Sequence, residues 1–253
     1  SYRHLTIWDK GEVVELTPPH DVLGQKIGRY LPADDKLREM MKRSYDILSS
    51  HPINAERIKN GLNPANSLWF WGAGTRPMLT SFEEKTGHKG AMISAVDLLK
   101  GIAVGADMKV VEVEGANGGL NTNYEGKADA AVDVLLNGDC DFAYIHLEAP
   151  DEMGHQGSYE RKVKAIENLD KRIIKRVVEK LEAAGENFRM LVLPDHPTPV
   201  AIRTHISDPV PYMLYDSTDK QEHIWFYNEK DAEASGNYIA EGHTIINRLF
   251  EKN

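Results

Sequence analysis

The chain has 253 residues, 41% of them hydrophobic, which is enough to bury the core of one large domain. Its formal net charge of -9 argues against a nucleic-acid-binding protein, because a phosphate backbone requires a basic protein face. A single cysteine, Cys140, and the lack of an apolar run of about 18 residues predict a soluble, cytoplasmic protein without an internal disulfide or a membrane span.

The first quarter of the chain predicts one strand and one helix. Residues 2–8 have the pattern of a strand, and the proline- and glycine-containing stretch 17–28 indicates turns. Residues 34–50 predict a helix, because apolar side chains recur there at helical spacing.

From about residue 66 onward the pattern changes to alternating strands and helices. Strands are predicted at 68–71, 90–93, 109–113, 141–147, 189–193 and 210–215, and helices at 80–86, 94–104, 123–137, 158–184 and 232–251. Such alternation predicts a three-layer α/β/α domain, with a sheet covered by helices on both faces. Ligands of such sheets bind beyond the carboxyl ends of the strands, so functional residues are expected there.

Metal-ligand side chains follow the predicted strand 141–147. Asp151 and His155 lie in a segment that Pro150 and Gly154 are expected to keep irregular, so that both side chains curl round one point. His146, inside the strand, is expected to be a core histidine with a polar partner. The glycine-rich run 115–119 lacks the spacing of a phosphate-binding loop and predicts a tight turn before the helix at 123–137.

Two further segments carry the same residue types. Asp195 and His196 follow the predicted strand 189–193, between two prolines, and His205 lies just before the strand 210–215. Mixed carboxylate and imidazole ligands suit Mn²⁺ or Zn²⁺ better than Mg²⁺. Because five ligands exceed what one catalytic ion needs, the pattern favours two ions, as used in phosphoryl displacement. A solvated loop is the alternative for each segment taken alone, and the charged run 161–176 is expected to be an exposed helix face.

The ligand segments also carry a family resemblance. Segments 148–157 (EAPDEMGHQG), 193–199 (LPDHPTP), 203–205 and 208–211 resemble the archaeal-type 2,3-bisphosphoglycerate-independent phosphoglycerate mutases. Upstream segments 63–74 (NPANSLWFWGAG), 93–101 and 121–127 share that resemblance. The family belongs to the alkaline phosphatase superfamily and includes a subgroup proposed to be homoserine kinases.

The resemblance implies a metal-dependent isomerase that interconverts 3-phosphoglycerate and 2-phosphoglycerate through a phosphoserine. Asp151, His155 and His205 would hold one ion, and Asp195 and His196 the other. The small phosphorylated substrate would contact basic residues for which a surface salt bridge is the alternative role, namely Lys85, Arg76, Arg3 and His4.

One departure from the family pattern concerns the nucleophile. Family members begin with a strand ending in Asp-Gly, followed by the nucleophilic serine, and neither is found in this sequence. The resemblance thus implies that residues 1–65 are the C-terminal part of an inserted substrate-covering domain and that 66–253 form the metal-binding domain. The chain alone is then expected to be inactive and to need the N-terminal segment of the same protein. A homoserine kinase-like enzyme, a hydrolase and a non-catalytic metal-binding fragment are the alternatives.

Overall fold

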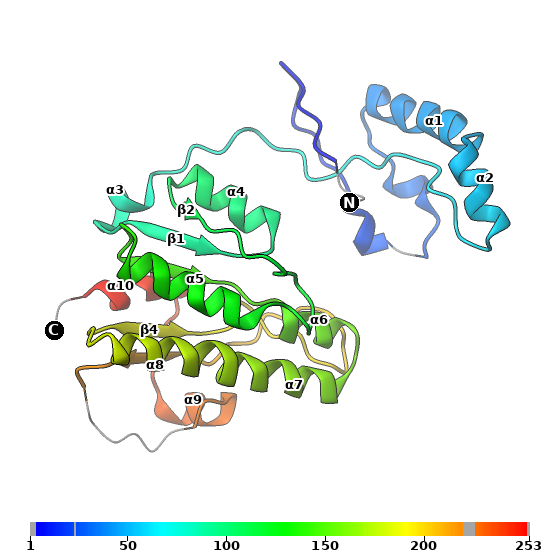
Figure 1. Cartoon of the computed structure of the whole chain (residues 1–253). Helices are drawn as coiled ribbons and strands as arrows, with labels where there is room; N and C mark the ends of the chain where they lie inside the picture. Colours follow the sequence, from blue (N-terminus) through cyan, green and yellow to red (C-terminus); the bar gives the residue numbers. More distant parts are fainter. Residues whose placement is uncertain (1–3, 23, 220–225, 252–253) are drawn as a thin grey trace. The chain divides into compact units, whose positions relative to one another are not determined.

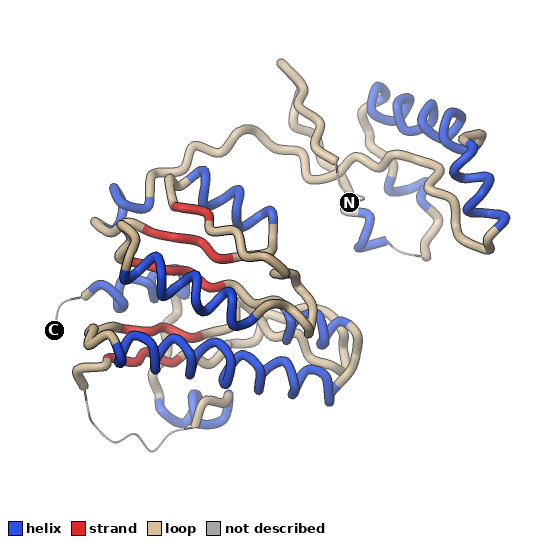
Figure 2. Tube along the Cα trace, viewed as in Figure 1, coloured by secondary structure: helices blue, strands red, loops and turns tan. Residues whose placement is uncertain are grey.

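The computed structural model describes residues 4–22, 24–219 and 226–251, which form two compact units divided between Pro77 and Met78. Each unit is considered by itself (Figures 1 and 2). Within the described residues, no helix is both long and apolar enough to cross a membrane.

The first unit is built around two helices. After short 3-10 turns at η1 (Pro19–Val22) and η2 (Ile27–Tyr30) come α1 (Asp35–Ser49) and α2 (Pro52–Lys59). The side chain of Asp34 caps α1 by accepting the Leu37 amide at 2.7 Å, which places the start of the helix within one residue of the prediction. The expected strand at 2–8 is not formed over its described part, residues 4–8.

The segment after α2 corrects a second strand prediction. Residues 68–71 are not a strand, because the backbone of this region is bonded to the first unit instead. The Leu68 amide donates to the Ser44 hydroxyl at 2.9 Å, and the Trp69 indole donates to the Thr17 carbonyl at 2.7 Å. The compact units divide between Pro77 and Met78, and the expected domain boundary at residue 65 stays a prediction.

The second unit contains a parallel sheet and an antiparallel strand pair. The parallel sheet has the order β2-β1-β3, from β1 (Gly90–Ile93), β2 (Lys109–Val110) and β3 (Phe142–Ile145). The antiparallel pair consists of β4 (Arg189–Val192) and β5 (Met213–Asp216). The remaining elements are α3 (Phe82–Thr86), α4 (Asp97–Gly105), α5 (Tyr124–Leu136), α6 (Ala149–His155), α7 (Tyr159–Leu169), the π-helical turn η3 (Asp170–Ile174), α8 (Lys175–Ala183), α9 (Glu229–Ser235), η4 (Gly242–Thr244) and α10 (Ile245–Phe250).

Helices cover both faces of β3, which confirms the predicted α/β class. Ala143 and Ile145 pack against the two core clusters that include α5, whereas Phe142 stacks on Phe82 and meets the edge of Phe250 from α10. Because successive strand residues point to opposite faces, α5 and α10 lie on opposite sides of the strand. The main core joins α5, α6, α7, η3 and α8, where Met153 and Val177 are almost fully buried.

Two helix predictions differ in outcome. The helical rod predicted at 158–184 is confirmed as α7, η3 and α8 in unbroken succession, with the π turn in its middle. The helix predicted at 232–251 is wrong as a single element. Gly236 adopts a left-handed conformation with a φ of 69° and ends α9, because such a backbone cannot continue an α-helix.

Candidate metal centre

Asp151 and His155 are brought together by a helix, which corrects the expectation of an irregular segment. Residues 149–155 form α6, because Pro150 lies in the first turn, where its missing N–H is not needed. The two ligands are four residues apart and so share one helix face, with His155 Nε2 3.4 Å from an Asp151 carboxylate oxygen.

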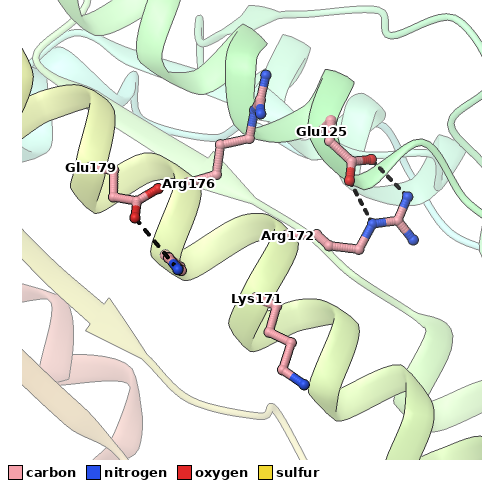
Figure 3. A pocket seen from close by; sticks show the side chains of 6 residues that line it. Glu125, Lys171, Arg172, Arg176 and Glu179 are labelled. Atoms are coloured by element: carbon pink, nitrogen blue, oxygen red, sulfur yellow. Dashed lines mark hydrogen bonds and ion pairs between the residues drawn. The ribbon is translucent and has the colours of Figure 1, made fainter.

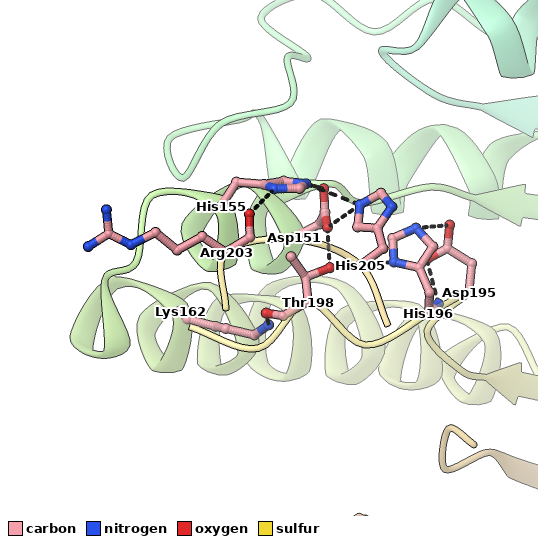
Figure 4. A network of polar contacts seen from close by, with 8 residues as sticks. All are labelled: Asp151, His155, Lys162, Asp195, His196, Thr198, Arg203 and His205. Atoms are coloured by element: carbon pink, nitrogen blue, oxygen red, sulfur yellow. Dashed lines mark hydrogen bonds and ion pairs between the residues drawn. The ribbon is translucent and has the colours of Figure 1, made fainter. Parts of the chain in front are cut away.

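The second set of ligands lies in the long connection between β4 and β5. Asp195 and His196 come after the end of β4, and His205 lies farther along the same connection. Gly154 of α6 allows this connection to approach, since a Cβ at that position would lie 2.4 Å from the Thr198 carbonyl oxygen. All five predicted ligands therefore gather in one place (Figure 4).

Arg203 orients His155 through its backbone. Its φ of 60° is unusual for a residue with a side chain, and the Arg203 carbonyl oxygen lies 3.0 Å from His155 Nδ1. A carbonyl can only accept a hydrogen bond, so Nδ1 carries the proton and Nε2 is left with a free lone pair. This arrangement is typical of a metal-binding histidine.

The spacing of Asp151, His155 and His205 fits a single ion. Two atoms that each lie about 2.1 Å from one ion are about 3.0 Å apart at a right angle and about 3.4 Å apart at a tetrahedral angle. The two Nε2 atoms are 3.1 Å apart, and Asp151 oxygens lie 3.4 Å from His155 Nε2 and 3.3 Å from His205 Nε2. The Nε2 atoms of His155 and His205 therefore lie at a separation suited to a shared divalent ion, and each lies close to a different oxygen of the Asp151 carboxylate.

Asp195 and His196 form an adjoining pair. His196 Nε2 lies 3.2 Å from an Asp195 oxygen, and the rings of His196 and His205 are in contact, with centroids 3.7 Å apart and planes tilted by 32°. Ligand atoms of Asp151, His196 and His205 all lie within 4.8 Å of one another, so this pair is continuous with the first group. The Asp195 side chain is 74% exposed, which leaves this side of the cluster open to a ligand.

Buried and half-buried polar residues support the end of β3. Lys127 is fully buried on α5 and donates to the His146 carbonyl oxygen at 3.0 Å. His146 Nδ1 lies 3.3 Å from the Ser94 hydroxyl, which confirms it as a core histidine with a partner. Burial lowers the pKa of both Lys127 and His146, and it raises the pKa of the nearby Glu148 carboxyl. The only sequence signal for Lys127 was a lysine among the alanines of an apolar helix.

The predicted turn at 115–119 is confirmed. The Gly119 amide donates to the Asn117 side chain at 2.8 Å, and the Asn117 amide donates to the Thr122 hydroxyl at 3.0 Å. A Cβ on Gly118 would lie 2.9 Å from a Glu148 oxygen, so the missing side chain lets this carboxylate pack on the turn.

Of the predicted substrate-binding residues, only Lys85 lies in the same unit as the ligands. Lys85 is exposed on α3, whose Phe82 packs on the first residue of β3, at the end of the sheet opposite the ligands (Figure 1). We therefore leave Lys85 out of the candidate site. Arg76 and His4 are exposed residues of the first unit, so their roles stay predictions, and Arg3 lies outside the described residues.

A separate hollow of about 360 Å³ lies along α5, η3 and α8 (Figure 3). Its arginines are paired with carboxylates: Arg172 forms two bonds to Glu125, at 2.6 and 2.7 Å, and Arg176 forms two to Asp129, at 2.7 and 2.8 Å. The expectation of a simple exposed face at 161–176 is therefore wrong for these two residues. They join the helical rod to α5, and their charges are neutralised.

Comparisons with known proteins point to a family of metal-dependent enzymes. A family model described as Metalloenzyme superfamily matches residues 20–249. The chain is 49% identical over 242 residues to a 2,3-bisphosphoglycerate-independent phosphoglycerate mutase of Methanosarcina barkeri, covering 93% of this chain and 60% of that protein. It is 41% identical to a probable enzyme of the same name from Geobacter sulfurreducens, covering 99% of this chain and 63% of that protein.

Two solved structures share the fold. The PH0037 protein of Pyrococcus horikoshii matches with a TM-score of 0.67 and 34% identity, covering 79% of this chain and 51% of that one. The cofactor-independent phosphoglycerate mutase of Thermoplasma acidophilum matches with a TM-score of 0.51 and 28% identity, covering 85% of this chain and 50% of that one. The family resemblance is confirmed, and the chain spans about 60% of the length of the curated relatives it matches.

Proposed function

This chain belongs to the metalloenzyme superfamily, and from that premise we propose that the whole protein interconverts 3-phosphoglycerate and 2-phosphoglycerate by metal-dependent phosphoryl transfer. The observation that carries the proposal is the convergence of Asp151, His155 and His205 at mutual separations of 3.1 to 3.4 Å, beside Asp195 and His196. The names of the similar archaeal proteins supply the substrate class.

The donor set fits two divalent ions. Asp151, His155 and His205 would hold one ion, and Asp195 and His196 would contribute to the other. Three of the five ligands are imidazoles, a composition that favours Mn²⁺, with Zn²⁺ or Mg²⁺ as alternatives. When bound, such ions polarise phosphoryl oxygens and lower the pKa of an attacking hydroxyl.

The protein's own groups have the task of holding the ligands in one arrangement. The Arg203 carbonyl oxygen fixes the ring of His155, and the close approach of the His196 and His205 rings limits the rotation of each. Because the chain is acidic overall, a phosphorylated substrate would be attracted by the bound ions and not by the mean charge of the surface. The free, buried Cys140 suits a reducing compartment, so the cytoplasm is part of this proposal.

We place the phosphoserine outside this chain. Ser94, the serine bonded near the end of β3, is only 4% exposed, and its oxygen accepts the Val96 amide at 3.0 Å, so a substrate cannot reach it. Among the described residues, β3 pairs only with β1 and β4 only with β5, although β3 and β4 border the same core cluster. An additional segment of the same protein could therefore extend the sheet at these unpaired edges and supply the serine.

Metal content is the first test. The chain is stripped with a chelator, reloaded with Mn²⁺ and assayed by elemental analysis beside a His155→Ala/His205→Ala double variant. A His243→Ala variant, altered at an exposed histidine whose nearest ion-pair partner is Glu241, serves as the control. We expect at least one tight ion per chain in wild type and control and its loss in the double variant. Equal metal content in all three would refute the centre.

Activity is tested separately on the protein at its natural length. Conversion of 3-phosphoglycerate to 2-phosphoglycerate is followed by phosphorus NMR, with and without Mn²⁺, and ATP-dependent phosphorylation of homoserine is assayed in parallel. We expect metal-dependent mutase turnover at natural length and none from residues 1–253 alone. Homoserine phosphorylation without mutase turnover would overturn the substrate assignment, and turnover by residues 1–253 would overturn the placement of the serine.

A further inference from the structure

Thr198 lies buried between the two groups of ligands. Thr198 is only 3% exposed. Its hydroxyl Oγ1 donates a hydrogen bond to an Asp151 carboxylate oxygen (Figure 4). The same Oγ1 lies 3.4 Å from His196 Nδ1. One hydroxyl therefore contacts one ligand from each predicted ion site.

Counting protons defines what this hydroxyl does. A threonine hydroxyl has a single proton, and an ionised carboxylate can only accept, so the Thr198 proton is committed to Asp151. Oγ1 is then available to His196 only as an acceptor, so a hydrogen bond between them requires the proton on His196 Nδ1. With the proton there, a neutral His196 has a free lone pair on Nε2, which lies 3.2 Å from an Asp195 oxygen and could share an ion with it.

Two further contacts fix the Thr198 backbone. Lys162 Nζ, on α7, donates to the Thr198 carbonyl oxygen at 2.6 Å. On the opposite side, Gly154 of α6 lies so close that a Cβ there would meet this same oxygen at 2.4 Å. Thr198 is thus held between two helices, and its hydroxyl has little freedom to leave the ligands.

We propose that Thr198 is a positioning residue that holds the Asp151 carboxylate in its ligand orientation and sets His196 in the tautomer that binds metal through Nε2. The proposal rests on the metal centre of the proposed function but not on the mutase reaction. The alternative is a purely structural role, in which the Thr198 hydroxyl only links α6 to the connection between β4 and β5. In that case its loss would lower the stability of the fold and leave metal affinity unchanged.

The test compares three variants by titration with Co²⁺, whose visible absorption reports ligand geometry. Thr198→Val removes the hydroxyl at nearly constant shape, and Thr198→Ser retains it. Thr122→Val is the matched control, because Thr122 is also 3% exposed and its hydroxyl serves an amide away from the ligands. We expect Thr198→Val to bind Co²⁺ about ten- to a hundredfold more weakly with an altered spectrum, as for lost outer contacts of other metal sites. Thr198→Ser should stay within about threefold of wild type, and Thr122→Val should be unchanged.

Each other outcome has a defined meaning. Unchanged affinity and spectrum in a folded Thr198→Val chain overturn the role of Thr198 and leave the metal centre standing. Failure of wild type to bind Co²⁺ overturns the centre, and this proposal with it. If Thr198→Val does not fold, nitrogen NMR of the Zn²⁺-loaded wild type decides: a proton on His196 Nδ1 with zinc on Nε2 supports the proposal, and zinc on Nδ1 overturns it.

Discussion

Gly154→Ala tests how closely α6 must approach the ligand-bearing connection. The new Cβ would lie 2.4 Å from the Thr198 carbonyl oxygen and 3.0 Å from its Cγ2. A carbon–oxygen contact needs about 3.3 Å, so the two segments must separate by about 0.9 Å. Both are fixed: Gly154 is buried in a helix, and the Thr198 carbonyl is bonded to Lys162.

Two effects of opposite sign set the magnitude. Alanine favours a helix over glycine by about 1 kcal/mol, whereas forcing an extra carbon into a packed site costs about 1–3 kcal/mol. Separation also weakens the bond from Thr198 to Asp151, worth about 1 kcal/mol. We expect a net loss of about 1–2 kcal/mol of unfolding free energy, together with a roughly tenfold loss of metal affinity.

Gly101→Ala is the matched control for this experiment. Gly101 is exposed within α4, and a Cβ there would meet no atom within 4 Å. This variant should gain about 0.5–1 kcal/mol through helix propensity alone and keep its metal affinity. The assays are urea denaturation and calorimetric metal titration. If Gly154→Ala were as stable as Gly101→Ala and bound metal like wild type, the close approach would not matter and the reasoning would be refuted.

Three further changes test the surroundings of the site. The hydrogen bonds from Arg176 hold the pKa of Asp129 at about 2, below its ordinary 3.8. The ionised Asp129 therefore stabilises the fold fully above about pH 4, and this contribution to the unfolding free energy is lost as the pH falls through about 2. Asp129→Asn should cost about 1 kcal/mol of unfolding free energy at pH 7, after allowance for solvent screening, and progressively less as the pH falls through about 2 in urea titrations. Burial lowers the pKa of Lys127, so the folded chain loses this proton before the unfolded chain does. Wild type should therefore gain stability relative to Lys127→Met as the pH rises toward 10.5, and parallel pH profiles would contradict this. Ser94→Ala leaves the Val96 amide unpaired and should cost about 1–3 kcal/mol, with faster hydrogen exchange at that amide; unchanged exchange would count against the bond.

Local patterns in the sequence were sufficient to predict most helices and to pick out the five candidate ligands that the structure brings together. The helix α1 and the rod α7–η3–α8 follow from apolar side chains at helical spacing. This signal is local, because the residues that carry it lie within a few helical turns of one another. Asp151 and His155 were found because they follow an apolar strand, where side chains of parallel sheets reach the ligand edge. The same local reasoning failed at residues 68–71, which donate hydrogen bonds to Ser44 and Thr17 and do not pair as a strand.

Tertiary structure alone decided how the ligands are held. No periodicity links Gly154 to Thr198, Lys162 to the carbonyl it binds, or Lys127 to His146, because these partners are far apart along the chain and meet only when the core has packed. The amino-acid sequence determines which residue types are available at the strand ends. The distances that allow a carboxylate and two imidazoles to share one ion depend on how α6 packs against the connection after β4, since metal ligands must converge within a few ångströms.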